Sequence, residues 1–301
     1  MHLENRHFLL LADIEGSSGC WRRSAAQFLT PEWARACMAM TRDVNSTARA
    51  LLEAGAAAVT VHDFHRTGYN LLPEYLDPRI ELKQGYCPGR VPGVGDPRPA
   101  RAALFIGMHG ASGTPAFLAH TLTSRVARLT VNGRPLSELE LFAAALGSAG
   151  IRPIFFSGCP EACRQALSAI PGMATHALDK TKGRINFRPR AWRIQLGQAA
   201  SRAARHPGPA PYRPPGPFRA RLLWGPGPEA ARKLAGRWEM PCQGAELTIE
   251  ADDLSDLYRQ LLNVCYLTPA LNRVLPAALA LYRMVGRCGL QWVRYRLRSR
   301  R

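Results

Sequence analysis

The feature that most constrains this chain is a short apolar run that ends in two acids. Residues 7–16 read HFLLLADIEG, so an apolar segment at 8–12 is followed by Asp13 and Glu15. Such a run is typical of an interior strand of a parallel sheet. Side chains two positions apart lie on the same side of a strand, so both acids should leave its carboxyl end into one space. Ligands bind beyond this edge in open α/β sheets, and two like charges there favour a metal ion.

Further strands bring potential ligands to the same edge. Residues 31–54 have the capping pattern of a long helix, and residues 58–62 predict a second strand. The order strand, helix, strand places the second strand parallel to the first. It is followed by His65, and a third apolar run at 102–108 is followed by His109. Three strands that end in such side chains argue against the alternative, an Asp-x-Glu that merely begins a solvated loop.

The rest of the chain divides at a proline-rich segment, HPGPAPYRPPGPF at 206–218, which predicts an extended linker. Before it we expect a hairpin at 126–135, a strand at 151–157 and helices from 138, 160 and 189. After it, the order strand, helix, strand, helix predicts a small domain. The predicted class is α/β: a parallel-sheet domain with helices on both faces at 1–205, the linker at 206–218, an α+β domain at 219–270 and a basic helical tail at 271–301.

Charge is unevenly distributed along the chain. The formal net charge is +18, and the residues from Leu271 onward carry eight arginines and no acid. Such a tail could meet a membrane surface, nucleic acid or an acidic partner. We expect peripheral contact with an anionic surface through this tail, and no nucleic acid as a partner.

The cysteine pattern and the N-terminal residues indicate in which cellular compartment the protein is expected. The eight cysteines form no CxxC pair and no regular framework, as expected for reduced thiols in a cytoplasmic protein. The first residues include Glu4 and only a five-residue apolar run, too short for a secretion signal. No stretch reaches the roughly 18 apolar residues of a membrane span. We therefore expect a cytoplasmic location.

The candidate ligands are carboxylates and imidazoles without thiolates. This donor set suits zinc, manganese or cobalt at a catalytic site rather than a structural zinc site. Five ligands exceed what one tetrahedral ion accepts, whereas two ions bridged by one carboxylate would use all five. Such a pair activates water for amide hydrolysis. The candidates are Asp13, Glu15, His65, His109 and Glu138, with His120 nearby.

The chain resembles the D-aminopeptidase family of di-zinc metallopeptidases typified by the bacterial dipeptide-transport-operon protein. The motifs that carry the resemblance are ADIEGSSG, VHDFH, LFIGMHGASGTP, AHT and NGRPLSELEL. The resemblance implies two zinc ions per subunit bridged by Asp13, with Glu15 and Glu138 on one ion and His65 and His109 on the other. It implies that His120 is the catalytic histidine. It also implies a ring-forming homo-oligomer, such as a decamer, and short peptides of D-residues as substrates.

Two positions depart from the family pattern. Cys159 stands where an aspartate is expected, and Phe142 stands where asparagine is usual. Both changes leave the proposed ligands intact and bear on substrate specificity. The favoured function is a zinc-dependent aminopeptidase that acts on N-terminal, D-configured residues of short peptides or aminoacyl amides. The alternatives are an amidohydrolase of a modified or biosynthetic peptide, and a non-catalytic homologue that binds anionic surfaces through its tail.

Overall fold

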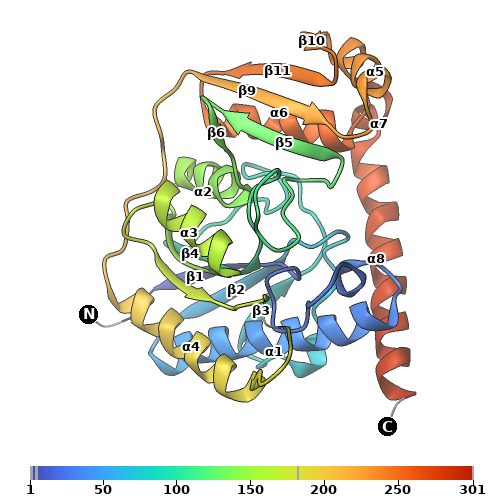
Figure 1. Cartoon of the computed structure of the whole chain (residues 1–301). Coiled ribbons are helices and arrows are strands. Elements are labelled where there is room, and N and C mark those ends of the chain that lie inside the picture. The colour runs from blue at the N-terminus through green and yellow to red at the C-terminus, as the bar shows by residue number, and fades with distance from the viewer. Residues whose placement is uncertain (1–2, 4–5, 182, 300–301) are drawn as a thin grey trace.

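A six-stranded parallel sheet carries the strand predicted from HFLLLA at its centre, in the order β3-β2-β1-β4-β7-β8 (Figure 1). The computed structural model describes residues 3, 6–181 and 183–299 of the chain. The predicted strands are confirmed within about one residue at their ends, whereas the short strands β3 and β8 were not predicted. The strands are β1 (His7–Ala12), β2 (Ala58–Asp63), β3 (Ile80–Lys83), β4 (Ala102–Met108), β7 (Arg152–Gly158) and β8 (Ala174–Ala177).

Helices cover both faces of this sheet, which confirms the predicted fold class. On one face, Phe8 and Leu10 of β1 pack in a core with α1 (Pro31–Glu53) and α4 (Pro189–Arg205). On the other, Leu9 and Leu11 pack in a core with α2 (Glu138–Ser148) and α3 (Pro160–Ala169). Alternate residues of the strand thus enter opposite cores, which is why its sequence is apolar at every position.

The strand order reverses between β1 and β4, and the candidate site lies at this point. The chain runs outward from β1 through β2 to β3 and then returns to place β4 on the other side of β1. The backbone of Asp13 donates to Ile106 at 2.8 Å, and that of Gly16 donates to Gly107 at 2.7 Å. The segment after β1 is therefore tied to the end of β4. Such a reversal opens the crevice in which doubly wound sheets bind ligands.

The second sheet is antiparallel and has the order β10-β11-β9-β5-β6. The region after the linker supplies β9 (Phe218–Trp224), β10 (Cys242–Gln243) and β11 (Glu246–Ala251), with α5 (Pro228–Trp238) and α6 (Leu254–Tyr266). The predicted hairpin, β5 (Val126–Val131) and β6 (Arg134–Pro135), joins this sheet through pairing of β5 with β9. The sheets therefore do not follow the expected division, which assigned residues 126–135 to the first domain. A hairpin pattern predicts its own turn but not the long-range partner of its outer edge.

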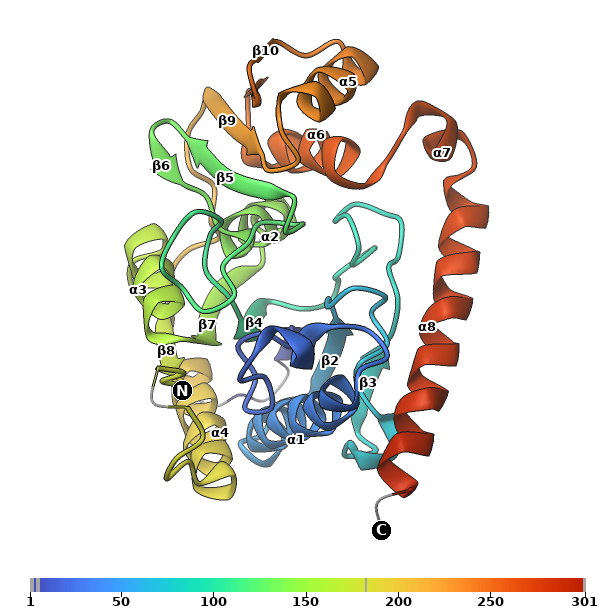
Figure 2. The same cartoon turned by 45° about the vertical axis from the view of Figure 1, so that its right-hand side comes forward.

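The linker and the tail connect the two halves on opposite sides of the molecule (Figure 2). Residues 207–217 contain no helix or strand. The last residues form α7 (Pro269–Arg273) and α8 (Leu275–Arg298), and α8 runs down one side of the molecule from the second sheet to α1. Among the described helices, none has the length and apolar character needed to cross a bilayer.

The contact between Gly107 and the Asp13 segment gives a stability prediction. A Cβ at Gly107 would lie 2.3 Å from the backbone oxygen of Asp13, and the Gly107 φ is +74°. Gly133, in the β5–β6 turn, has a φ of +83° but open space around it. We expect Gly133→Ala to lower the free energy of unfolding by about 1 kcal/mol and Gly107→Ala to lower it by roughly 3 kcal/mol or more. Urea unfolding measures both, and equal losses would contradict the steric argument.

His62 gives a prediction for pH. Burial, with a contribution from the Lys83 charge, lowers the pKa of His62 from 6.5 to about 4. The unfolded chain therefore binds a proton on His62 between these values while the folded chain does not. The stabilisation from neutral His62 is present above about pH 6.5 and is lost as the pH falls toward 4. When the pH falls from 7 to 4, the free energy of unfolding of the wild type should decrease by about 3 kcal/mol more than that of His62→Gln. Urea unfolding at both pH values measures this difference. Parallel curves for the two proteins would refute this assignment.

Candidate metal centre

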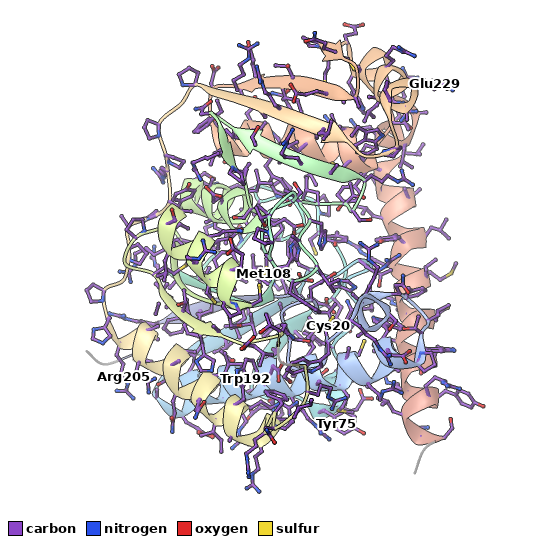
Figure 3. All side chains as sticks on the ribbon, in the orientation of Figure 1. Cys20, Tyr75, Met108, Trp192, Arg205 and Glu229 are labelled. Atoms are coloured by element: carbon purple, nitrogen blue, oxygen red, sulfur yellow. The ribbon has the colours of Figure 1, made fainter. Side chains whose placement is uncertain are left out.

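The residues predicted as ligands converge at the carboxyl ends of β1 and β4. Met108, at the end of β4, and Cys20, in the segment after β1, lie in the middle of the molecule (Figure 3). The potential ligand atoms form two groups, each within 4.8 Å: Asp13, Glu15 and His65 make one, and His109, His120 and Glu138 make the other. The structure thus brings together all six residues selected from the sequence.

Asp13 faces both groups. Its Oδ1 lies 3.3 Å from Nδ1 of His65, and its Oδ2 lies 3.4 Å from Nε2 of His109. Within the groups, Glu15 is 3.1 Å from Nδ1 of His65, and Glu138 is 3.4 Å from Nε2 of His109. This arrangement suits a bridging Asp13. The short distances join Glu15 to His65 and Glu138 to His109. The family resemblance instead implied that Glu15 and Glu138 share one ion.

Backbone carbonyls fix which nitrogen of each imidazole faces the centre. Nε2 of His65 is 3.0 Å from the oxygen of Ala26, Nδ1 of His109 is 3.1 Å from that of Gly110, and Nδ1 of His120 is 2.9 Å from that of Leu118. A carbonyl oxygen only accepts, so each of these nitrogens carries the hydrogen. The other nitrogen of each ring is then the one that can bind a metal ion when it carries no proton. This is the arrangement by which metal-binding histidines are oriented.

The centre needs a cation or protons between its ligands. Oε2 of Glu15 is buried and has no hydrogen-bond partner among the described residues, although Nδ1 of His65 is 3.1 Å away. A lone pair facing a carboxylate at this distance is repulsive. In tetrahedral zinc sites with bonds of about 2.0–2.1 Å, neighbouring ligand atoms lie about 3.3 Å apart. The measured separations of 3.1–3.4 Å therefore fit metal coordination.

The pKa shifts express the same requirement. Burial and the nearby Glu15 charge raise the pKa of Asp13 to about 7. Burial would lower the pKa of His109, but the charges of Glu138 and Asp13 outweigh it and raise that pKa to about 10. Protons are therefore held between the carboxylates and imidazoles. Metal binding to such ligands displaces protons.

His120 lies beside the second group. Its ring stacks on that of His109, with centroids 3.8 Å apart and planes 15° from parallel. Burial and the His109 charge lower the pKa of His120. The ring is therefore neutral near pH 7, with its Nε2 lone pair available as a proton acceptor or as a further ligand.

The loop that carries His65 is built around Asp63, which lies buried at the end of β2. Asp63 accepts hydrogen bonds from the backbones of His65 (3.2 Å) and Leu71 (3.1 Å) and from the side chain of Asn70 (2.9 Å). Asn70 also donates to the backbone oxygen of His65 at 2.7 Å and accepts from the Trp33 indole at 2.9 Å. Asp63 thus orients the His65 backbone rather than its ring. Nothing in the local sequence marks Asn70 or Trp33.

Helix α8 braces this loop from outside. The Gly286 backbone packs so closely on Tyr69 that a Cβ would lie 2.3 Å from its ring. Trp292 stacks on Trp33 at 6.0 Å, and Arg294 forms a two-point ion pair with Glu74 at 2.8 and 2.9 Å. The buried side of the tail therefore belongs to the core that supports His65.

The segment that carries Asp13 and Glu15 is held by two buried charges. Nζ of Lys180 donates to the backbone oxygens of Ser17 and Cys20, and burial lowers its pKa to about 8. Asp43 on α1 accepts from the backbone and hydroxyl of Ser18, both at 2.7 Å, and from Arg193 on α4 at 2.7 Å. These contacts join elements far apart in sequence, so local patterns could not indicate them.

The two departures from the family pattern have structural roles. Cys159 caps α3, and its sulfur accepts from the backbones of Ala162 and Phe117 at 3.4 Å. Phe142 packs edge-on against Phe64 at 4.9 Å and against Tyr258 at 5.6 Å. Phe64 directly precedes His65, so Phe142 is a buried residue that packs against the neighbour of a candidate ligand.

The fold and the paired ligand groups define an α/β protein with a candidate two-metal centre at the reversal of its parallel sheet. A family model described as D-aminopeptidase matches residues 7–262, and the chain belongs to this family. A curated D-aminopeptidase from Bacillus subtilis (strain 168) is 29% identical over 174 residues, which cover 57% of this chain and 63% of that protein. The chain thus matches under two thirds of the length of this relative.

A solved structure with the same fold is the Zn-dependent D-aminopeptidase DppA from Bacillus subtilis, described as a self-compartmentalizing protease. It superposes with a TM-score of 0.76 at 22% identity, covering 86% of this chain and 97% of that chain. This likeness confirms the fold, a mixed α/β structure with a six-stranded parallel sheet and a further antiparallel sheet.

The position of Asp13 between the groups gives a prediction for metal content. Asp13→Asn should abolish binding of both ions, because the neutral amide cannot serve as a charged bridge. Glu138→Gln removes a carboxylate from one group only, so this variant should keep one of two equivalents. Equilibrium dialysis against zinc with elemental analysis measures both. Retention of two equivalents in Asp13→Asn would show that Asp13 does not bridge.

Proposed function

We propose that this chain is a zinc-dependent aminopeptidase that removes an N-terminal amino acid, of D-configuration, from short peptides or aminoacyl amides. The observation that carries the proposal is that Asp13 contacts both ligand groups: its carboxylate lies 3.3 Å from Nδ1 of His65 and 3.4 Å from Nε2 of His109, and a backbone carbonyl orients each ring. Membership of the D-aminopeptidase family supports the reaction class. The Zn-dependent neighbour supports zinc, and the donor set supports two ions per subunit.

The residues around the centre would divide the work of amide hydrolysis. Zinc ions bound here would supply a water of lowered pKa and polarise the substrate carbonyl. Asp13, Glu15, His65, His109 and Glu138 would hold them, and the free amine of the substrate would pair with a carboxylate of the centre. His120, neutral near pH 7, would take up a proton at Nε2 and return it to the leaving amine nitrogen.

Substrate choice and assembly belong to the same proposal. Phe64, which is partly exposed beside His65 and packs on the buried Phe142, would favour an apolar substrate side chain. The amidohydrolase alternative, which acts on a modified or biosynthetic peptide, would use the same residues. The self-compartmentalizing neighbour supports a ring-forming homo-oligomer, such as a decamer. The eight free cysteines fit a reducing, cytoplasmic compartment.

A panel of D- and L-aminoacyl amides, offered to the zinc-loaded protein, tests the function. We expect hydrolysis of the D-amides at a rate well above that of their L-enantiomers, with preference for apolar side chains. If protein that holds two zinc equivalents hydrolysed neither the D- nor the L-amides, the amidohydrolase or the non-catalytic alternative would be favoured.

His120→Ala separates the proposed proton transfer from metal binding. The variant should keep both zinc equivalents and nearly unchanged KM while kcat falls by roughly 10²- to 10⁴-fold, because the lost interaction acts in the transition state. Elemental analysis and steady-state kinetics check the two parts. Loss of one zinc equivalent would make His120 a ligand, and unchanged kcat would exclude it from catalysis.

A further inference from the structure

Helix α8 has one side packed on the protein and another side that is apolar and exposed. Its buried residues include Gly286, Gly289 and Val293. The opposite side exposes Leu281 (60%), Met284 (55%) and Tyr295 (67%). These residues are separated by three and eleven positions, close to whole helical turns, so they lie along one stripe. An exposed apolar stripe of this length marks an interaction surface.

The charged side chains carried by α7 and α8 themselves are all positive. The chain from Leu271 onward has eight arginines and no acid. Arg294 and Arg283 are engaged on the protein side, with Glu74 and with the backbone of Tyr86. Within the described part of the chain, neither Arg287 on α8 nor Arg273 at the end of the neighbouring helix α7 forms an ion pair, and both are exposed. The free face of α8 therefore combines apolar side chains with unneutralised positive charge.

The position of α8 leaves this face open. In both views the helix lies at the outer edge of the molecule, and no other helix or strand of the described residues covers its far side (Figures 1 and 2). It is 24 residues long, about 36 Å at 1.5 Å per residue. The family match ends at residue 262, before α7 and α8 begin. The surface thus lies outside the part of the chain that defines the family.

We propose that the exposed face of α8 binds an anionic lipid bilayer, with the helix lying in the plane of the membrane surface. An amphipathic helix that carries arginines beside an apolar stripe inserts its apolar side chains at the boundary between headgroups and acyl chains. Its arginines are attracted by anionic headgroups. A second copy of this chain is a poorer partner, because pairing two such faces would bring together positive charges with no acid between them.

The membrane-bound state is compatible with the metal centre. The packed side of α8 contacts Tyr69 and Trp33, next to the His65 loop, while the stripe faces away from them. Binding to the bilayer would therefore leave the centre intact and would hold the protein at the membrane surface. This inference does not depend on the proposed hydrolytic activity.

Co-sedimentation of the full-length protein with vesicles tests the proposal. We expect binding to vesicles of equal parts phosphatidylglycerol and phosphatidylcholine, weak binding to phosphatidylcholine alone, and loss of binding at raised ionic strength. Leu281→Ser with Met284→Ser should weaken binding by about tenfold, since the apolar contribution is removed. Arg273→Gln with Arg287→Gln should weaken it by a similar factor, roughly tenfold.

A matched control uses exposed apolar residues on other helices. Leu167 on α3 and Ile194 on the basic helix α4 are 44% and 51% exposed. Leu167→Ser with Ile194→Ser should leave vesicle binding unchanged, and circular dichroism with thermal unfolding should show that all variants remain folded. Equal weakening in the control would overturn the assignment to α8. If Leu281→Ser with Met284→Ser changed the molar mass seen by light scattering but left vesicle binding as in the wild type, the stripe would instead bind a second copy of the chain.

Discussion

Two carboxylates buried at the end of the central strand are the constraint on which the rest of this structure depends. Asp13 and Glu15 lie in the interior, where an unpaired negative charge is strongly destabilised. Neighbouring imidazoles reduce this destabilisation only when protons are held between them and the carboxylates, as the raised pKa values of Asp13 and His109 indicate. A divalent cation relieves it more completely, because all the ligands are then deprotonated and facing positive charge. The surrounding fold supplies ligands in the number and spacing that such cations require.

The precision of this centre comes from backbone groups rather than from side chains alone. Each of the three imidazoles is oriented by a backbone carbonyl, and the His65 loop is wrapped around Asp63. Glycine at position 107 lets the end of β4 approach the Asp13 backbone more closely than any other residue would allow. The tail adds a further support, since α8 packs on Tyr69 and Trp33 behind this loop. A helix outside the family match thus contributes to the rigidity of the centre.

Local patterns predicted much of the fold, because strands and helices in this chain carry strong periodic and capping signals. Helix α4 begins at the predicted residue, Pro189, and β4 has both of its predicted bounds. The strands β3 and β8 were missed, since each has only four residues and partly exposed side chains, which leaves little apolar pattern. The pairing of β5 with β9 was also missed. Strands β7 and β8 of the first sheet lie between β5 and β9 in the sequence. A local pattern does not indicate which distant strand will pair with a given edge.

For the site, the sequence by itself determined the chemistry: which residue types stand at the carboxyl ends of β1, β2 and β4, and therefore that carboxylates and imidazoles meet at one edge. The rule that parallel strands end at the same edge is enough for that conclusion. Only the tertiary structure decided how the ligands are grouped, with Glu15 beside His65 and Glu138 beside His109. It also decided that Asn70, Lys180 and α8 hold them in place. Grouping and support depend on distances between segments far apart in the chain, which packing sets and local sequence does not encode.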